Sequence, residues 1–69
     1  MSVYKIIEIV GTSSESWEKA AQSAMEVASK SLRDLRIAEV EKLDLQLEDS
    51  QIKAYRVKLK VSFKYHSGD

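Results

Sequence analysis

The last third of the chain alternates between apolar and polar side chains without interruption from residue 55 to residue 65. The apolar positions of this segment are Tyr55, Val57, Leu59, Val61, Phe63 and Tyr65. Successive side chains of a β-strand point to opposite faces, so the pattern predicts a long strand with one apolar and one polar face. The apolar side chains are β-branched or aromatic, which favours a half-buried sheet surface. We expect the rest of the chain to cover this face.

A strand and a helix are predicted before this segment. Residues 3–10 are rich in β-branched side chains and predict a first strand, which Gly11 is expected to end. Residues 14–32 carry mostly small apolar side chains at helical spacing, and Trp17 is the large exception. These spacings predict a helix that packs closely on a sheet, with Trp17 in the core or at an interface. Its expected N-cap is Ser13 or Ser14.

Residues 35–47 predict a second long strand, joined to the last one by a turn at Asp49 and Ser50. The predicted pairs are Ala38 with Val61 and Val40 with Leu59 on the helix-facing side, and Glu39 with Lys60 and Glu41 with Lys58 on the other side. Opposite charges directly across two strands contribute roughly 0.2–1 kcal/mol per pair. The basic side chains of the last strand therefore indicate a solvated or cross-paired face rather than a surface for nucleic acid.

The predicted fold class is α+β: a β-α-β-β protomer, with one helix packed on a three-stranded antiparallel sheet, in a single domain spanning residues 1–69. One helix can cover only one face of the sheet. The predicted far face nevertheless carries the apolar side chains Ile37, Leu43, Leu45, Leu47, Ile52 and Ala54. A contiguous exposed apolar patch is typical of an interface, so we expect the protein to assemble with copies of itself.

Composition excludes several functions. Acidic and basic residues balance at 11 each, so net charge does not favour nucleic acid or an anionic membrane. No apolar run approaches the ~18 residues of a membrane span, and the start lacks the apolar core of a signal peptide, so a cytoplasmic protein is expected. The chain has no cysteine, and its one histidine, His66, lies in a polar tail where metal binding is not expected. With no nucleophile–base pair and no phosphate loop, we expect a protein that is not an enzyme.

Three segments resemble the dodecin family in their order and spacing. They are Tyr4-Lys5-x-x-Glu8-Ile9-Val10-Gly11-Thr12-Ser13, Leu35-x-x-x-Glu39-Val40 and Tyr55-x-Val57-x-Leu59-x-Val61-x-Phe63. The resemblance covers essentially the whole chain. It implies a hollow homododecamer with threefold and twofold axes. It also implies flavin binding in the better-known members, for storage or quenching rather than catalysis.

The positions that match the flavin pocket of those members are changed in this chain. Ile37 stands where the resemblance implies a tryptophan that stacks on the isoalloxazine ring, Arg56 where it implies a glutamine, and Asp44 where it implies a basic residue. Isoleucine cannot stack, and arginine donates hydrogen bonds but cannot accept them. These changes argue against high-affinity flavin binding. An ion pair between Asp44 and Arg56 could close the pocket, but the predicted register puts them on opposite faces, so such a pair is expected between subunits.

The chain is more similar to the calcium-dodecin subgroup, which also lacks the stacking tryptophan. Its segments Ser2-Val3-Tyr4-Lys5, Ser16-Trp17-Glu18, Ile37-Ala38 and 55–64 carry this resemblance. Calcium takes ~6–8 oxygen ligands, so one chain cannot supply the shell, but a threefold axis gathers three copies of one carboxylate. Glu15 is the first candidate ligand, and Asp44, Glu48 and Asp49 are others. For each of them a solvated carboxylate or, for Glu15, a partner of the helix dipole is the more common role of such a residue.

The sequence thus predicts a homo-oligomeric protein that binds or stores a small ligand or an ion, with an altered flavin pocket and calcium as the candidate ion. Two alternatives remain open. One is a flavin-sequestering protein with weak flavin affinity, and the other is a purely structural oligomeric domain.

Overall fold

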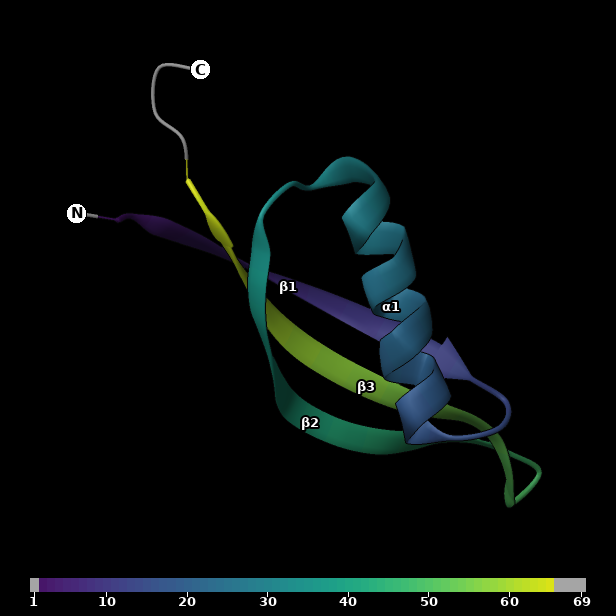
Figure 1. Ribbon diagram of the computed structural model, residues 1–69. Helices are drawn as coiled ribbons and strands as arrows, with labels where there is room; N and C mark the ends of the chain where they lie inside the picture. The colour runs from purple at the N-terminus through teal and green to yellow at the C-terminus, as the bar shows by residue number, and fades with distance from the viewer. Residues whose placement is uncertain (1, 66–69) are drawn as a thin grey trace.

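The computed structural model describes residues 2–65 and has the predicted β-α-β-β order (Figure 1). Its elements are β1 (Tyr4–Ser13), α1 (Trp17–Ser31), β2 (Leu35–Glu48) and β3 (Gln51–Lys64). The strands form one antiparallel sheet in the order β1-β3-β2, so the alternating strand β3 is central. α1 lies on β1 and β3 (Figure 1). The predicted fold class is confirmed, and His66 lies outside the described residues.

β1 continues past Gly11 to Ser13, so the prediction that Gly11 ends the strand is wrong. Gly11 is buried and lies opposite Val57 of β3. A Cβ at this position would overlap the carbonyl oxygen of Ala20 and lie 2.8 Å from the Cβ of Ala24. The glycine is therefore required by the close approach of α1 to β1, and not by a turn.

The N-cap of α1 is Ser16, so the expectation of Ser13 or Ser14 is wrong. The Ser16 hydroxyl accepts a hydrogen bond from the backbone N–H of Lys19 at 3.0 Å. The Ser13 hydroxyl accepts one from the backbone N–H of Glu15 at 3.0 Å instead. Because β1 runs on to Ser13, that hydroxyl orders the connection between strand and helix, and the helix begins later.

The hydrophobic core is small and lies beneath α1. Its buried members are Ala20, Val57, Leu59 and Val61. Trp17 packs beside them, edge-on to the ring of Tyr55, with 5.2 Å between the ring centroids. Its indole N–H donates a hydrogen bond to the backbone carbonyl of Asp44 at 3.2 Å. Trp17 is therefore a packing residue, as predicted, and it links α1 to β2.

β2 contains an extra residue that changes its register on β3. Up to Val40 the predicted pairs are present: Ala38 with Val61, Glu39 with Lys60, and Val40 with Leu59. Beyond this point Lys42, and not Glu41, lies opposite Lys58, because the register shifts between Val40 and Lys42. The predicted pairing of Glu41 with Lys58 is therefore wrong. The carboxylate of Glu41 lies 3.9 Å from the ammonium group of Lys60 instead.

The extra residue moves the second half of β2 to the other face of the sheet. The pairs on the α1 side are Leu43 with Val57, Leu45 with Tyr55, and Leu47 with Ile52 near the turn. Residues that lie opposite one another share a face. The predicted far-face patch is therefore wrong for these three leucines, and it is also wrong for Ile52 because the register shifts again between Gln46 and Leu47. It is correct for Ile37 and Ala54, which lie opposite Ser62 and Gln46.

The two-residue turn between β2 and β3 is formed by Asp49 and Ser50, as predicted. Both residues have positive φ angles, 51° for Asp49 and 63° for Ser50. Positive φ at both central positions defines the tight hairpin turn whose twist matches that of the flanking strands. The turn therefore fixes the register at the end of the hairpin, where Glu48 lies opposite Gln51 and Leu47 opposite Ile52.

Candidate functional site

Asp44 and Arg56 lie directly opposite one another on the far face of the sheet. The guanidinium Nε and Nη2 atoms of Arg56 donate to the two carboxylate oxygens of Asp44 at 2.7 and 3.2 Å. The expectation that such a pair forms only between subunits is wrong, because the extra residue in β2 brings both side chains to one face. The hydrogen bonds from Arg56 lower the pKa of Asp44, and the same contact raises the pKa of Arg56.

A second ion pair on this face joins the outer strand β1 to β3. The ammonium group of Lys58 lies 3.1 Å from the carboxylate of Glu8. Hydrogen bonding to Lys58 lowers the pKa of Glu8, and the same contact raises the pKa of Lys58. Sequence reasoning missed this pair, although a glutamate between two isoleucines was a signal for it. The prediction of a cross-paired charged face is confirmed.

The structure does not bring Ile37 together with the Asp44–Arg56 pair in one protomer. Ile37 lies opposite Ser62 and Asp44 lies opposite Arg56, so the two positions are six residues apart along β3. This separation is roughly 20 Å at about 3.3 Å per residue. Ile37 borders a shallow hollow of about 180 Å³, which is smaller than the ~300–1,000 Å³ of usual small-molecule pockets. A single protomer therefore has no ready-made site for a flavin at these positions.

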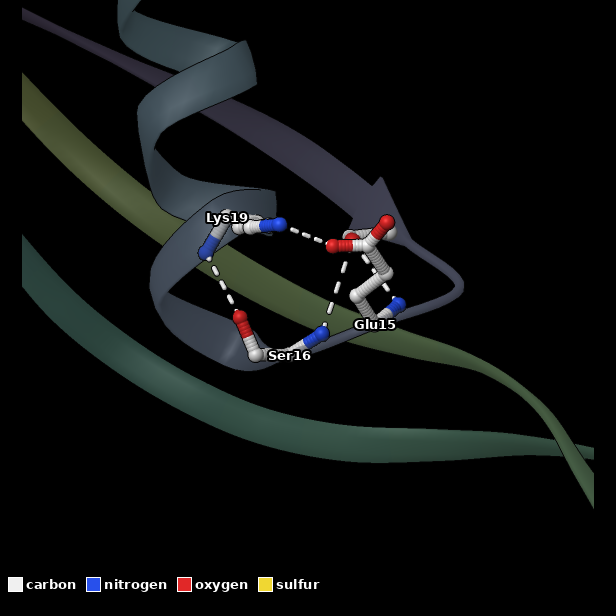
Figure 2. A network of polar contacts seen from close by, with 4 residues as sticks. Glu15, Ser16 and Lys19 are labelled. Carbon is white, nitrogen blue, oxygen red and sulfur yellow. Dashed lines mark hydrogen bonds and ion pairs between the residues drawn. The ribbon is translucent and has the colours of Figure 1, made fainter.

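Glu15 lies in the exposed connection before α1, where Figure 2 shows its carboxylate meeting the ammonium group of Lys19. The backbone N–H groups of Glu15 and Ser16 both face the hydroxyl of Ser13. The Glu15 carboxylate is the charged oxygen ligand of this connection, and carboxylate oxygens are ligands that calcium prefers. One protomer supplies only one carboxylate here, so this connection alone does not complete a calcium shell.

Two of the other candidate carboxylates form ion pairs within the protomer, and the third lies in a turn. Glu48 pairs with Lys53 at 2.8 Å, and Asp44 pairs with Arg56 as described above. Asp49 occupies the tight turn. Within residues 2–65, no group of three or more acidic or histidine side chains is placed to hold a metal ion.

No helix in the described part of the chain is long and apolar enough to cross a membrane. The protomer has two polar surfaces of interest: the far face with its paired charges, and the exposed serine-rich connection that carries Glu15. These features define a class of small β-α-β-β proteins whose single helix leaves much of a long hairpin uncovered. The family model described as Dodecin matches residues 3–66, and the chain belongs to the dodecin family.

Named relatives agree with this assignment. The chain is 48% identical over 64 residues to a calcium dodecin of Mycobacterium tuberculosis, covering 93% of this chain and 90% of the relative. It is 42% identical over 62 residues to a dodecin of Thermus thermophilus, covering 90% of each. The predicted similarity to calcium dodecins is confirmed.

Solved structures share the fold over nearly the whole chain. A crystal structure of the calcium-chelating calcium dodecin of M. tuberculosis, described as having a novel calcium-binding site, superposes with a TM-score of 0.86. That structure is 44% identical and covers 99% of this chain and 97% of its own. A substitution variant of the T. thermophilus dodecin superposes with a TM-score of 0.90 at 39% identity, covering 97% of this chain and 100% of its own.

Proposed function

We propose that this chain forms a hollow homododecamer that binds a small ligand or an ion at contacts between its subunits, and that it is not an enzyme. Membership of the dodecin family supports the assembly. The exposed apolar side chains of the protomer support it independently, because Val40, Leu43 and Leu47 are each more than half exposed. Such side chains gain a cover when copies associate.

The ion pair between Asp44 and Arg56 is the observation that carries the choice of ligand. Arg56 and Asp44 match two positions of the flavin pocket, and each already satisfies the other. A flavin would have to compete with this bidentate contact, and charge-assisted bidentate contacts are among the stronger hydrogen bonds. At the third position, Ile37 offers no aromatic ring for stacking. The proposed ligand is therefore not a tightly bound flavin.

Calcium is the proposed ion, with Glu15 as its first protein ligand. The similarity to a protein named calcium dodecin supports the choice of ion. The exposure of Glu15 supports the choice of residue, because 61% of its side chain is accessible to neighbouring copies. Copies of Glu15 gathered at a threefold axis would supply several carboxylate oxygens. The carboxylate of each Glu15 would then leave the ammonium group of Lys19 and bind the ion.

The test combines a spectrum with a titration. The purified oligomer is expected to be colourless, and calcium is expected to bind it in isothermal titration calorimetry. Glu15→Gln keeps the shape of the side chain but removes its charge, so it should weaken calcium binding at least about tenfold, which is about 1.4 kcal/mol. Glu18→Gln, at an exposed position in the first turn of α1, is the matched control and should bind calcium as the wild type does.

Other outcomes would replace this proposal. A yellow protein with a flavin absorbance band would establish retained flavin binding despite Ile37. A colourless oligomer that binds no calcium would leave a structural role. Equal loss of calcium binding in the Glu15→Gln and Glu18→Gln variants would contradict Glu15 as the ligand.

A further inference from the structure

The turn between β2 and β3 joins an aspartate to a serine at the end of the hairpin, away from both chain ends (Figure 1). Asp49 and Ser50 are both exposed. Both also have positive φ angles, 51° and 63°, a conformation that a Cβ makes unfavourable. The turn therefore presents two strained residues to solvent, and exposed tips of small polar residues are where changes to a chain concentrate.

An aspartate that precedes a small residue has a reactivity of its own. The backbone nitrogen of the following residue can attack the Cγ atom of the aspartate carboxyl, because the product is an unstrained five-membered succinimide ring. The two reacting groups are held next to one another by the chain itself, which favours an intramolecular reaction. A bulky side chain on the following residue shields the nitrogen, whereas the side chain of Ser50 is small.

The sequence directs this chemistry to one position within residues 2–65. This part of the chain contains three aspartates and no asparagine, whose side chain reacts in the same way. Asp34 and Asp44 each precede a leucine, and only Asp49 precedes a small residue. Asp34 also has a positive φ angle, 56°, so it separates the effect of backbone conformation from that of the following side chain. Asp44 lies within β2 and is held by Arg56.

The turn leaves the attacking nitrogen outside the hydrogen-bond ladder. In a two-residue hairpin the closing hydrogen bonds join the two flanking residues, which here are Glu48 and Gln51. The N–H group of Ser50 lies between them and takes no part in the ladder. The nitrogen can therefore approach the Asp49 carboxyl without the loss of a bond that pairs the strands.

We propose that Asp49 is a modification site, at which the peptide bond to Ser50 migrates from the main-chain carboxyl to the side-chain carboxyl. The Ser50 nitrogen bonds to Cγ of the protonated Asp49 carboxyl, the C–OH bond breaks, and one water leaves. Water then adds to the main-chain carbonyl carbon of Asp49, and the bond from that carbon to the Ser50 nitrogen breaks. One water is lost and one is gained, so the isoaspartyl product has an unchanged mass. The reaction needs only this chain and water, and is independent of the proposed ion.

The product changes the end of the hairpin. Its main chain runs through Cβ of Asp49 and is longer by one methylene group, and the α-carboxylate is free. A two-residue turn spans a fixed distance between paired flanks, so the pairs of Glu48 with Gln51 and Leu47 with Ile52 should be lost. The new α-carboxylate is the group that isoaspartyl-specific methyltransferases methylate with S-adenosylmethionine. The modified turn is therefore a substrate for that class of enzyme.

The test is a prolonged incubation of the native full chain at neutral pH, followed by digestion with trypsin. Cleavage after Lys42 and Lys53 releases residues 43–53, which contain both Asp44 and Asp49. Electron-transfer fragmentation distinguishes aspartate from isoaspartate at each position, and enzymatic methylation with labelled S-adenosylmethionine measures the amount. Isoaspartate is expected to accumulate at Asp49, and not at Asp44 or Asp34. The modified chain, once separated, should unfold at a lower temperature than the unmodified chain.

Asp49→Glu is the matched variant. It keeps the carboxylate, but its ring would have six members and forms far more slowly, so the methylation signal should be lost. The inference is overturned if Asp49 stays unmodified in the native chain, and a parallel incubation in urea then shows whether the turn protects it. Equal modification at Asp34 or Asp44, or an undiminished signal in the Asp49→Glu chain, would also overturn it.

Discussion

Gly11 sets how closely the helix approaches the sheet. Its missing side chain leaves room for the backbone of Ala20 and the methyl group of Ala24. Gly11→Ala should therefore lower the free energy of unfolding by about 1–3 kcal/mol, the usual range for overpacking a tight contact. Urea unfolding followed by tryptophan fluorescence measures this loss. Thr12→Ala, at the exposed neighbouring position, is the control and should stay within about 0.5 kcal/mol of the wild type. Equal stability of Gly11→Ala and wild type would contradict the close approach.

The Asp44–Arg56 pair makes stability depend on pH in the acid range. Because Arg56 lowers the pKa of Asp44 in the folded chain, the unfolded chain binds the proton more tightly, and stability must fall as protons are added. The contribution is complete above the unfolded pKa of about 3.9 and is lost as pH falls through the lower folded pKa.

The pH dependence of the thermal midpoint measures this contribution. Asp44→Asn should show a smaller fall in midpoint than the wild type below pH ~4. Arg56→Gln removes the partner and should flatten the curve in the same way, and the double variant should add little further change. Parallel acid curves for wild type and Asp44→Asn would show that the contact does not stabilise the fold. Glu8, which also has a lowered pKa, should maintain part of the slope in all variants.

At the scale of elements, the alternation of β3 sufficed to predict the sheet, whereas the register of β2 was predicted correctly around Val40 and wrongly from Lys42 to Gln46. The alternation of β3 has no break, whereas in β2 the polar residues Glu41 and Lys42 follow one another where the register shifts. The pairs near Val40 followed from a two-residue turn. A bulge has no glycine or proline signal here, and it reverses the face of every later side chain. That reversal is why Leu43 and Leu45 were assigned to the wrong side and why the Asp44–Arg56 pair was expected between chains.

The turn at Asp49 and Ser50 holds two non-glycine residues at positive φ. This conformation destabilises a residue that has a Cβ by roughly 1–2 kcal/mol, whereas glycine adopts it at little cost in free energy. Ser50→Gly should therefore raise the free energy of unfolding by about 1 kcal/mol, and chemical denaturation measures the gain. Ser29→Gly, within α1, is the control and should instead lose about 0.5–1 kcal/mol. A loss of stability in the Ser50→Gly variant would contradict the turn geometry.

At the scale of the whole molecule, the sequence indicated that the sheet needs a cover that one helix cannot provide. It could not show where the missing cover belongs, because that depends on how far α1 extends over β2. The candidate ligand positions have the same limit: Ile37 and Arg56 lie far apart on one protomer, and the proposed calcium site needs Glu15 from more than one chain. The residue types were enough to predict the chemistry of these candidate positions, whereas their relative geometry depends on the assembled protein.

If copies provide that cover, folding and assembly are coupled and thermal stability must depend on protein concentration. Each tenfold rise in concentration should stabilise the folded protomer by up to about 1.4 kcal/mol, which for a domain of this length raises the midpoint by several degrees. Differential scanning calorimetry over a hundredfold range tests this expectation. Leu45→Asp is the matched control, since a folded monomer has a midpoint that does not change with concentration. A wild-type midpoint that stayed constant would mean that the small core beneath α1, around Leu59 and Val61, stabilises the chain without its neighbours.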